Sequence, residues 1–160
     1  MTAVSLKKIL TDANKNNYAV AGLVVLAWDD ALAFTKAADE TGVPIILQAG
    51  PSCRAHTPVP ILGKMFRYLA AQTKTHVCCH IDHGYTFREC AEGIDSGFTS
   101  VMFDGSKLSL KENIKTTSKI VKRAHDAKVS VEGEIGFVGY ANGKLSEGTL
   151  PSEAVAFAKE

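Results

Sequence analysis

Short apolar runs rich in β-branched residues alternate along this chain with longer segments in which apolar residues recur at helical spacing. Strand-like runs begin near Ala19, Pro44, His76, Thr99 and Val129. The spacing between them predicts helices over 29–41, 59–74, 86–96 and 109–127, preceded by a helix from residue 5 and followed by one that starts near residue 152. Strict alternation of the two patterns predicts a parallel sheet of right-handed β-α-β units with helices on both faces.

Two of the predicted helices begin with a capping box. Thr86 stands three residues before Glu89, and Ser109 stands three residues before Glu112. In this arrangement the hydroxyl and the carboxylate each satisfy a free backbone amide of the first turn. The second of these helices also carries a stripe that would face the sheet, formed by Ile114, Thr117, Val121 and Ala124.

Polar side chains follow three successive predicted strands at the point where each strand ends. Asp82 and His83 close the third run, Asp104 closes the fourth and Glu134 closes the fifth. Because the carboxyl ends of parallel strands meet at one edge of a sheet, we expect these groups to lie together. Neighbouring strand residues point to opposite faces, so Asp82 can serve a substrate while His83 serves a metal held beside it.

For Asp82, a cap of the next helix and a general acid/base are the two open interpretations. Thr86 already occupies the better capping position, which favours acid/base chemistry for Asp82. His83 alone would be read as a loop histidine. The convergence expected with Asp104 and Glu134 instead gives the mixed imidazole and carboxylate set that zinc accepts.

Three further histidines lie close to these elements. His76 and His125 are interpreted as structural residues, since the C-terminal end of a helix suits an imidazole such as that of His125. His80 lies one inward step below Asp82, and both a structural and a functional role stay open for it.

Two loops carry weaker signals. Arg54 and His56 follow the second strand, where either side chain can meet an anion or simply be solvated. The segment 136–143 is rich in glycine but lacks the spacing of a phosphate-binding loop, so it is interpreted as an active-site loop or a plain turn.

Length, charge and cysteine usage narrow the class of protein. The 160 residues correspond to about one domain, taken as residues 1–160, which buries roughly 70% of its unfolded surface. A net charge of +1 gives no field that would attract nucleic acid or an anionic membrane.

The longest apolar stretch, 19–28, is too short to span a bilayer, so we expect a cytoplasmic protein. The four cysteines show no Cys-x-x-Cys spacing and are expected to be reduced.

Five strands in 160 residues fit two architectures. A flavodoxin-like, doubly wound sheet would be complete at this length. A (β/α)8 barrel typically needs about 250 residues and would be cut off here after its fifth strand. Length alone favours the open sheet.

Several ordered motifs resemble the class II, metal-dependent fructose-bisphosphate aldolase family. They are Asp-His-Gly at 82–84, Gly-Phe-Thr-Ser-Val-Met-Phe-Asp-Gly-Ser at 97–106, Glu-Asn-Ile at 112–114 and Val-Ser-Val-Glu-Gly-Glu-Ile-Gly at 129–136. The similarity runs from about residue 5 to residue 159. Members of this family are TIM barrels, so the resemblance implies that the five strands are the first part of a (β/α)8 barrel, whose active site lies at the strand C-termini.

The resemblance also implies roles for the four polar residues. Asp82 matches the catalytic acid/base, which handles the C4 hydroxyl proton as the C3–C4 bond of a phosphorylated ketose such as fructose 1,6-bisphosphate breaks or forms. His83 matches the first histidine ligand of the catalytic zinc, and Asp104 and Glu134 match carboxylates near the metal. A divalent cation stabilises the enediolate, so no lysine imine is needed. The products would be dihydroxyacetone phosphate and an aldehyde, and family members are often homo-oligomers.

The chain departs from the family pattern at several positions. It stops before the family's two remaining zinc histidines and its later phosphate-binding loop, so it is either a portion of a longer protein or a degenerate, inactive aldolase-like product. We expect the first, because the break falls just after a starting helix. Leu23-Val24-Val25 stands where an Asn is common, Gly50 where a Ser is common, and Tyr140-Ala141-Asn142 where acidic residues are usual. These changes leave the sugar open.

Two other functions compete with this interpretation. The first is a lyase that forms a Schiff base, for which Lys107, just beyond the fourth strand, is the candidate lysine. The second is a non-enzymatic open sheet in which Asp82 and Asp104 gather a cation.

Overall fold

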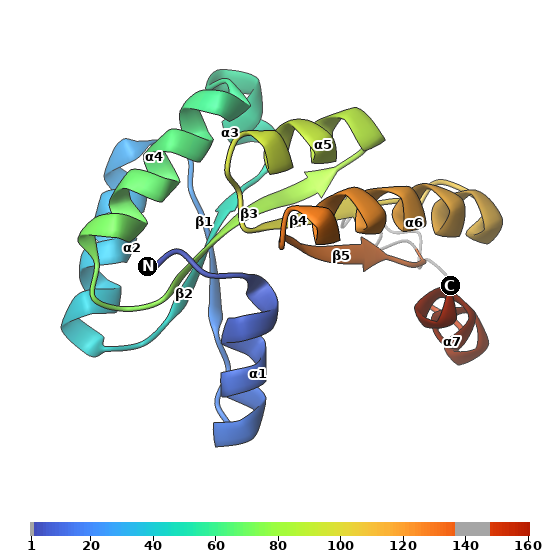
Figure 1. The fold of residues 1–160 in the computed structure, drawn as a ribbon, viewed down its shortest axis with the longest axis horizontal. Coiled ribbons are helices and arrows are strands. Elements are labelled where there is room, and N and C mark those ends of the chain that lie inside the picture. Colours follow the sequence, from blue (N-terminus) through green and yellow to red (C-terminus); the bar gives the residue numbers. More distant parts are fainter. Residues whose placement is uncertain (1, 137–147) are drawn as a thin grey trace.

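Five parallel strands form one sheet whose strand order follows the sequence (Figure 1). The computed structural model describes residues 2–136 and 148–160. The strands are β1 (Ala21–Val24), β2 (Ile45–Ala49), β3 (Val77–Gly84), β4 (Ser100–Asp104) and β5 (Ser130–Glu134). The helices are α1 (Leu6–Asn16), α2 (Trp28–Thr41), α3 (Pro51–His56), α4 (Val59–Gln72), α5 (Phe87–Asp95), α6 (Leu110–Asp126) and α7 (Pro151–Lys159). The strands and long helices predicted from the sequence are confirmed, with their ends displaced by one or two residues.

One helix was missed by the sequence pattern. Residues 51–56, interpreted as a loop, form the short helix α3. Six residues are too few to show a helical period, but Pro51 in the first turn is a start signal, because its fixed φ suits that position. The consequence is that Arg54 lies on a helix directly after β2.

Both predicted helix caps are present, but only the one at Ser109 is a complete capping box, because the Glu89 carboxylate accepts from the amide of Tyr85 instead of that of Thr86. The hydroxyl of Thr86 accepts a hydrogen bond from the amide of Glu89 at 3.1 Å. Ser109 and Glu112 form the complete reciprocal box, with amide-to-side-chain distances of 3.3 Å and 3.2 Å. Since Thr86 caps α5, Asp82 is free of the capping role that the sequence left open.

The expectation of helices on both faces is wrong for the crossover helices. α2, α4, α5 and α6 all bury their apolar side chains in one core cluster against one face of the sheet. Consecutive strands joined by crossovers of the same hand place every crossover helix on the same side, whereas a doubly wound sheet needs a reversal of strand order. The flavodoxin-like, doubly wound alternative is therefore excluded by the strand order.

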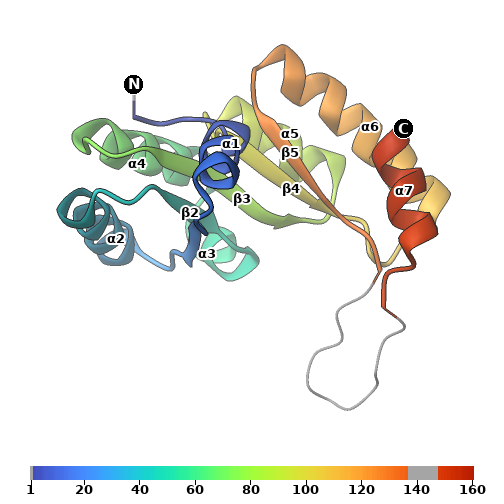
Figure 2. The ribbon, with the colours of Figure 1, turned by 90° about the horizontal axis from the view of Figure 1, so that it is seen from below.

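The opposite face carries α1 at its amino end. Leu6 and Ile9 of α1 form a separate cluster with Cys78, an inward residue near the start of β3. The amide of Lys7 donates to the hydroxyl of Ser130 at 3.1 Å, so α1 reaches across to β5 (Figure 2). The carboxyl half of this face is left to polar residues.

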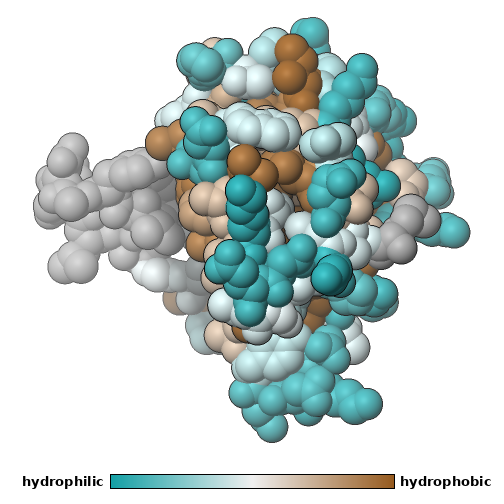
Figure 3. All heavy atoms as spheres, turned by 90° about the vertical axis from the view of Figure 1, so that its left-hand side faces the viewer, coloured by the Kyte–Doolittle hydropathy of each residue, from teal (hydrophilic) through white to brown (hydrophobic). Residues whose placement is uncertain are grey.

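The outer surface of the helix layer has the polar character expected of a surface that faces water. Seen from the side of α2 and α4, the molecule is mostly hydrophilic with scattered hydrophobic patches (Figure 3). No helix in residues 2–136 and 148–160 is long and apolar enough to cross a bilayer. The four cysteines are free and buried, as expected, and burial raises the pKa of Cys78 and Cys90 to about 12. These thiols are therefore unreactive and contribute only to packing.

Candidate active site

A β-bulge ends β3 at the residues that the sequence singled out. Ile81 pairs with Val101, but the next pair joins Gly84 to Phe103, so β3 takes three residue steps where β4 takes two. The bulge contains His83, whose φ of 53° lies in the left-handed region. Such a conformation costs a non-glycine residue about 1–3 kcal/mol, which the surroundings must supply.

The bulge overturns the expectation that Asp82 and His83 point to opposite faces. An extra residue re-aims the side chains that follow it. His83 Nε2 lies 3.8 Å from Asp82 Oδ1, so imidazole and carboxylate face the same space. The two groups still have separate neighbours, which allows the division of roles predicted from the sequence.

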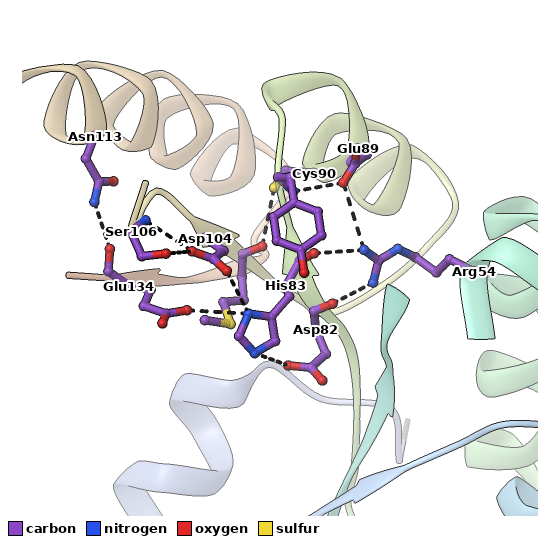
Figure 4. Close-up of polar contacts among 11 residues, drawn as sticks. Arg54, Asp82, His83, Glu89, Cys90, Asp104, Ser106, Asn113 and Glu134 are labelled. Atoms are coloured by element: carbon purple, nitrogen blue, oxygen red, sulfur yellow. Dashed lines mark hydrogen bonds and ion pairs between the residues drawn. The ribbon is translucent and has the colours of Figure 1, made fainter. Parts of the chain in front are cut away.

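Carboxylates from the two adjacent strands converge on the other ring nitrogen of His83. Its Nδ1 lies 3.0 Å from Asp104 Oδ2 and 3.4 Å from Glu134 Oε2 (Figure 4). Asp104 and Glu134 are paired across β4 and β5, so the sheet itself places them side by side. The structure thus brings together all four residues predicted from the strand ends.

Asp104 is held by the turn that follows β4. The amide and hydroxyl of Ser106 both donate to Asp104 Oδ1, at 3.1 Å and 2.6 Å, which leaves Oδ2 for His83. Burial would raise the pKa of Asp104, but these hydrogen bonds and that of His83 outweigh it and lower the pKa below its ordinary value. Asp104 therefore remains an anion next to His83.

Glu134 is positioned through its backbone by a residue of α6. Asn113 Nδ2 donates to the Glu134 carbonyl at 2.7 Å, while Asn113 Oδ1 accepts from Thr117 at 3.1 Å. Gly105 makes room for this amide, since a Cβ there would lie 2.1 Å from Asn113 Oδ1. The sequence assigned Asn113 no role. Its signal was a polar residue one turn before Thr117 on the stripe that faces the sheet.

That stripe is only partly as predicted. Thr117 and Ala124 are buried, whereas Ile114 and Val121 are only half-buried. Asn113 and Ile120 complete the buried face. The helix is therefore rotated towards the polar position that supports Glu134.

The donor set fits a divalent cation. Ligand atoms of His83, Asp104 and Glu134 lie within 4.8 Å of one another. Among the described residues, the buried Oε2 of Glu134 accepts no hydrogen bond. Burial and the charge of Asp104 raise the pKa of Glu134. A buried acceptor without a donor is costly, and a cation held by one imidazole and two carboxylates would satisfy it.

The same carboxylates govern the charge of the imidazole. Burial disfavours the charged ring, but the hydrogen bond to Asp104 and the negative charges of Asp82 and Glu134 outweigh it and raise the pKa of His83. The surroundings of this ring therefore attract positive charge, whether a proton or a metal ion.

His80 lies on β3 two residues before Asp82 and does not belong to the group formed by His83, Asp104 and Glu134. Its Nδ1 is 2.9 Å from the hydroxyl of Ser100, and its Nε2 is 3.6 Å from Glu132 Oε2. Burial, with smaller effects from the positive charges of His83 and Arg54, lowers the pKa of His80 to about 4. A neutral, hydrogen-bonded ring matches the structural alternative for this residue.

The remaining candidates fall outside the group. His76, His125 and Lys107 are exposed, and Lys107 lacks the desolvation that makes a lysine amine nucleophilic. His56 is also exposed, whereas Arg54 is half-buried, with a side chain only 9% exposed, and donates to backbone carbonyls. The anion that Arg54 meets is the carboxylate of Glu89, 3.9 Å away, so this contact lies within the protein. Most of the glycine-rich segment, 137–143, lies outside the described residues, as do positions 140–142.

Comparison with known sequences gives one consistent family. A model of the class II fructose-bisphosphate aldolase family matches residues 4–160. A fructose-bisphosphate aldolase of Staphylococcus epidermidis is 38% identical over 144 residues, which covers 87% of this chain and 50% of the relative. A fructose-bisphosphate aldolase of Ureaplasma parvum is 36% identical over 158 residues, covering 92% and 52%. The chain thus spans about half the length of the curated relatives it matches.

Solved structures show the same fold. The YdjI aldolase from Escherichia coli K12 superimposes with a TM-score of 0.83 at 24% identity, covering 98% of this chain and 57% of that one. Fructose-bisphosphate aldolase from Campylobacter jejuni gives a TM-score of 0.72 at 24% identity, covering 88% and 48%. The five-stranded sheet therefore corresponds to the first part of a TIM barrel, as the motifs implied.

Proposed function

We propose that this chain, which belongs to the class II fructose-bisphosphate aldolase family, provides the acid/base carboxylate and part of the metal site of a zinc-dependent aldolase. The reaction is cleavage or formation of the C3–C4 bond of a phosphorylated ketose such as fructose 1,6-bisphosphate. One observation carries the proposal: Asp82 and His83 share one space with Asp104 and Glu134 at the carboxyl edge of the sheet.

His83, Asp104 and Glu134 are the residues that would hold the metal. A bound divalent cation supplies Lewis-acid stabilisation of the negative charge that develops on the substrate oxygens as the bond breaks. Catalytic zinc commonly has three protein ligands, and carboxylates accompany histidine in such sets. Because the chain spans about half of its relatives, the complete activity is proposed for a polypeptide that also contains the other half.

Asp82 is the proposed acid/base. Its side chain is 17% exposed, so the carboxylate is accessible from the carboxyl edge while its backbone stays in the strand. In the cleavage direction it takes the proton of the C4 hydroxyl, and in the synthetic direction it returns that proton. Gly50, between β2 and α3, lies beside Asp82 Oδ2, where a Cβ would be 3.6 Å away, so the residue at this position leaves that oxygen uncovered.

Metal removal tests the proposal. The intact polypeptide is assayed for cleavage of fructose 1,6-bisphosphate after treatment with EDTA and again after addition of Zn²⁺. We expect loss and recovery of activity. Cleavage that persists in EDTA and is inactivated by borohydride in the presence of substrate would instead establish a Schiff-base lysine.

The proposed partner is a small phosphorylated sugar that yields dihydroxyacetone phosphate and an aldehyde. The predicted cytoplasmic location and homo-oligomeric state stay predictions. Native mass spectrometry of the intact polypeptide checks the second of these directly.

A further inference from the structure

A buried arginine connects α3 to the bulge that carries the site. Arg54 Nη1 donates to the carbonyls of Ala49 and Asp82, at 2.5 Å each, and Nη2 donates to the carbonyl of His83 at 2.9 Å. The Arg54 side chain is only 9% exposed. Figure 4 shows the guanidinium on the side of β3 opposite to Asp104 and Glu134. The guanidinium therefore binds the backbone behind the site and does not lie on the side where a substrate would bind.

Two of the three carbonyls, those of Asp82 and His83, lie beyond the end of β2, so β2 cannot pair with them. The last pair between β2 and β3 is Ala49 with Ile81, and Pro51 then begins α3. Asp82 and His83 extend beyond that pair, where β2 offers no backbone amide. Buried carbonyls without donors are destabilising. The guanidinium replaces the missing strand partner with donors in a planar, fixed arrangement.

The contacts fall on both sides of the strained residue. The Asp82 carbonyl belongs to the peptide group before the Cα of His83, and the His83 carbonyl belongs to the peptide group after it. Holding both peptide groups restrains the left-handed φ of 53° at His83. The direction of the imidazole is set by that backbone, so Arg54 controls where the ring points without touching it.

A carboxylate fixes the arginine in turn. Glu89 Oε2 lies 3.9 Å from Arg54 Nη2 and accepts a hydrogen bond from the amide of Tyr85 at 2.8 Å. Glu89 belongs to α5, so the ends of β2, β3 and α5 are joined around one buried cation. Removing the arginine would release the bulge of β3 from the ends of β2 and α5.

We propose that Arg54 is the positioning residue of the site: its guanidinium holds the Asp82–His83 bulge in the conformation that turns the imidazole towards Asp104 and Glu134. The expected effect of Arg54 on catalysis rests on the proposed function. Its effect on the orientation of the His83 ring does not depend on that function.

The test compares Arg54→Met and Arg54→Lys in the intact polypeptide, with Arg123→Met as the matched control. Arg123 forms an exposed ion pair with Asp95 between α6 and α5, so its replacement removes the same charge away from the site. Heteronuclear NMR of the histidine rings reads the position of His83 without metal, and calorimetric titration with Zn²⁺ reads the assembled site.

In the Arg54 variants we expect the ring signals of His83 to shift and broaden while those of His76 and His125 stay in place. Zn²⁺ affinity should fall by about 10- to 100-fold, the usual loss when the support of a metal ligand is removed. Arg54→Lys should lie between Arg54→Met and the wild type, because an ammonium reaches fewer of the carbonyls. Arg123→Met should change neither measurement.

Chemical rescue separates local positioning from general loss of structure. Adding guanidinium ion to Arg54→Met should restore part of the Zn²⁺ affinity, and sodium at the same ionic strength should not. Unchanged His83 signals in a folded Arg54→Met or Arg54→Lys variant would overturn the inference. Absence of aldol cleavage in the wild type would instead contradict the proposed function and leave the NMR result to decide the role of Arg54.

Discussion

At the carboxyl half of the sheet, the two faces built from the same strands have opposite compositions. On β3, Val77, Cys79 and Ile81 point to the helix layer and are fully buried in its apolar core. On the other face, His80 contacts Ser100 and Glu132, and Asp82 lies beside His83. At this end of the sheet one face packs against the apolar core and the other gathers polar groups, because alternation along a strand separates the two sets.

The bulge is the one place where this separation is broken. By simple alternation His83 would follow Ile81 onto the helix side. The extra residue in β3 and the left-handed φ of His83 move its ring to the side of Asp82. A site that needs a carboxylate and an imidazole from adjacent positions is obtained by a local change of backbone. Substitutions of residues on the face that carries the site should therefore alter activity. Substitutions of residues on the face covered by the helix layer should alter stability.

Asp82→Asn should give the largest functional effect. It removes the proposed acid/base but keeps the shape of the side chain, so the cleavage rate of the intact polypeptide should fall by about 10²- to 10⁴-fold. Zn²⁺ affinity and thermal stability should stay close to the wild type. Asp126→Asn, an exposed carboxyl group at the end of α6, is the control and should be neutral. Wild-type turnover in Asp82→Asn would contradict the acid/base role.

Phe98→Ala should show the reverse pattern. Phe98 is 1% exposed and packs edge-on against Phe66 with ring centroids 5.6 Å apart. Its truncation should cost about 3–5 kcal/mol in the free energy of unfolding, measured by urea denaturation. Phe87→Ala removes the same atoms from a ring that is 42% exposed, and should change stability by less than about 0.5 kcal/mol. Equal losses in both variants would argue against Phe98 as part of the core under the helices.

Gly105→Ala should affect both properties, because it lies where the helix layer supports the site. The new Cβ would displace the amide of Asn113 and with it the hydrogen bond to the Glu134 carbonyl. We expect a loss of about 1–3 kcal/mol in stability and weaker Zn²⁺ binding, measured by denaturation and calorimetric titration. Gly148→Ala, with open space around its Cα, should change neither. Full Zn²⁺ affinity in Gly105→Ala would show that Asn113 does not position Glu134.

The most gradual effect is a pH dependence of opposite sign at two histidines of β3. The folded-state pKa of His80 is lowered to about 4, whereas an unfolded histidine titrates near 6.5. Between these values the unfolded chain binds a proton that the folded chain does not, so stability falls as pH falls. The slope approaches about 1.4 kcal/mol per pH unit. Unfolding curves of wild type and His80→Gln should therefore diverge below about pH 6.5; parallel curves would contradict a buried neutral ring.

For His83 the sign is reversed. Its pKa is raised in the folded state, so its contribution to stability is complete below about 6.5 and is lost as pH rises through the raised value. A protonated imidazole cannot bind a metal, so Zn²⁺ affinity should weaken as pH falls through the same range. Calorimetric titrations at several pH values check this, and constant affinity would argue against His83 as a ligand.

The sequence was sufficient for the strands, for every helix except α3, and for the edge at which the polar residues meet. Hydrophobic periodicity and the caps at Thr86 and Ser109 located the helices, and parallel strands explained why Asp82, Asp104 and Glu134 converge. These features depend on local patterns and on a general rule of topology.

The features that the sequence did not reveal depend on contacts between distant residues. The bulge at His83 has no local signature, since its support comes from Arg54, which lies 29 positions earlier in the chain. The role of Asn113 depends on Gly105 and on the end of β5. The distribution of helices over one face follows from strand order, which strand and helix alternation alone leaves open.

Anomalous diffraction at the zinc absorption edge from Zn²⁺-soaked crystals of the intact polypeptide tests the central claim most directly. The account predicts a peak with a ring nitrogen of His83 at a zinc–nitrogen distance of about 2.0–2.1 Å, beside Asp104 and Glu134. A zinc peak bound elsewhere, with the His83 ring still paired only to carboxylates, would contradict it.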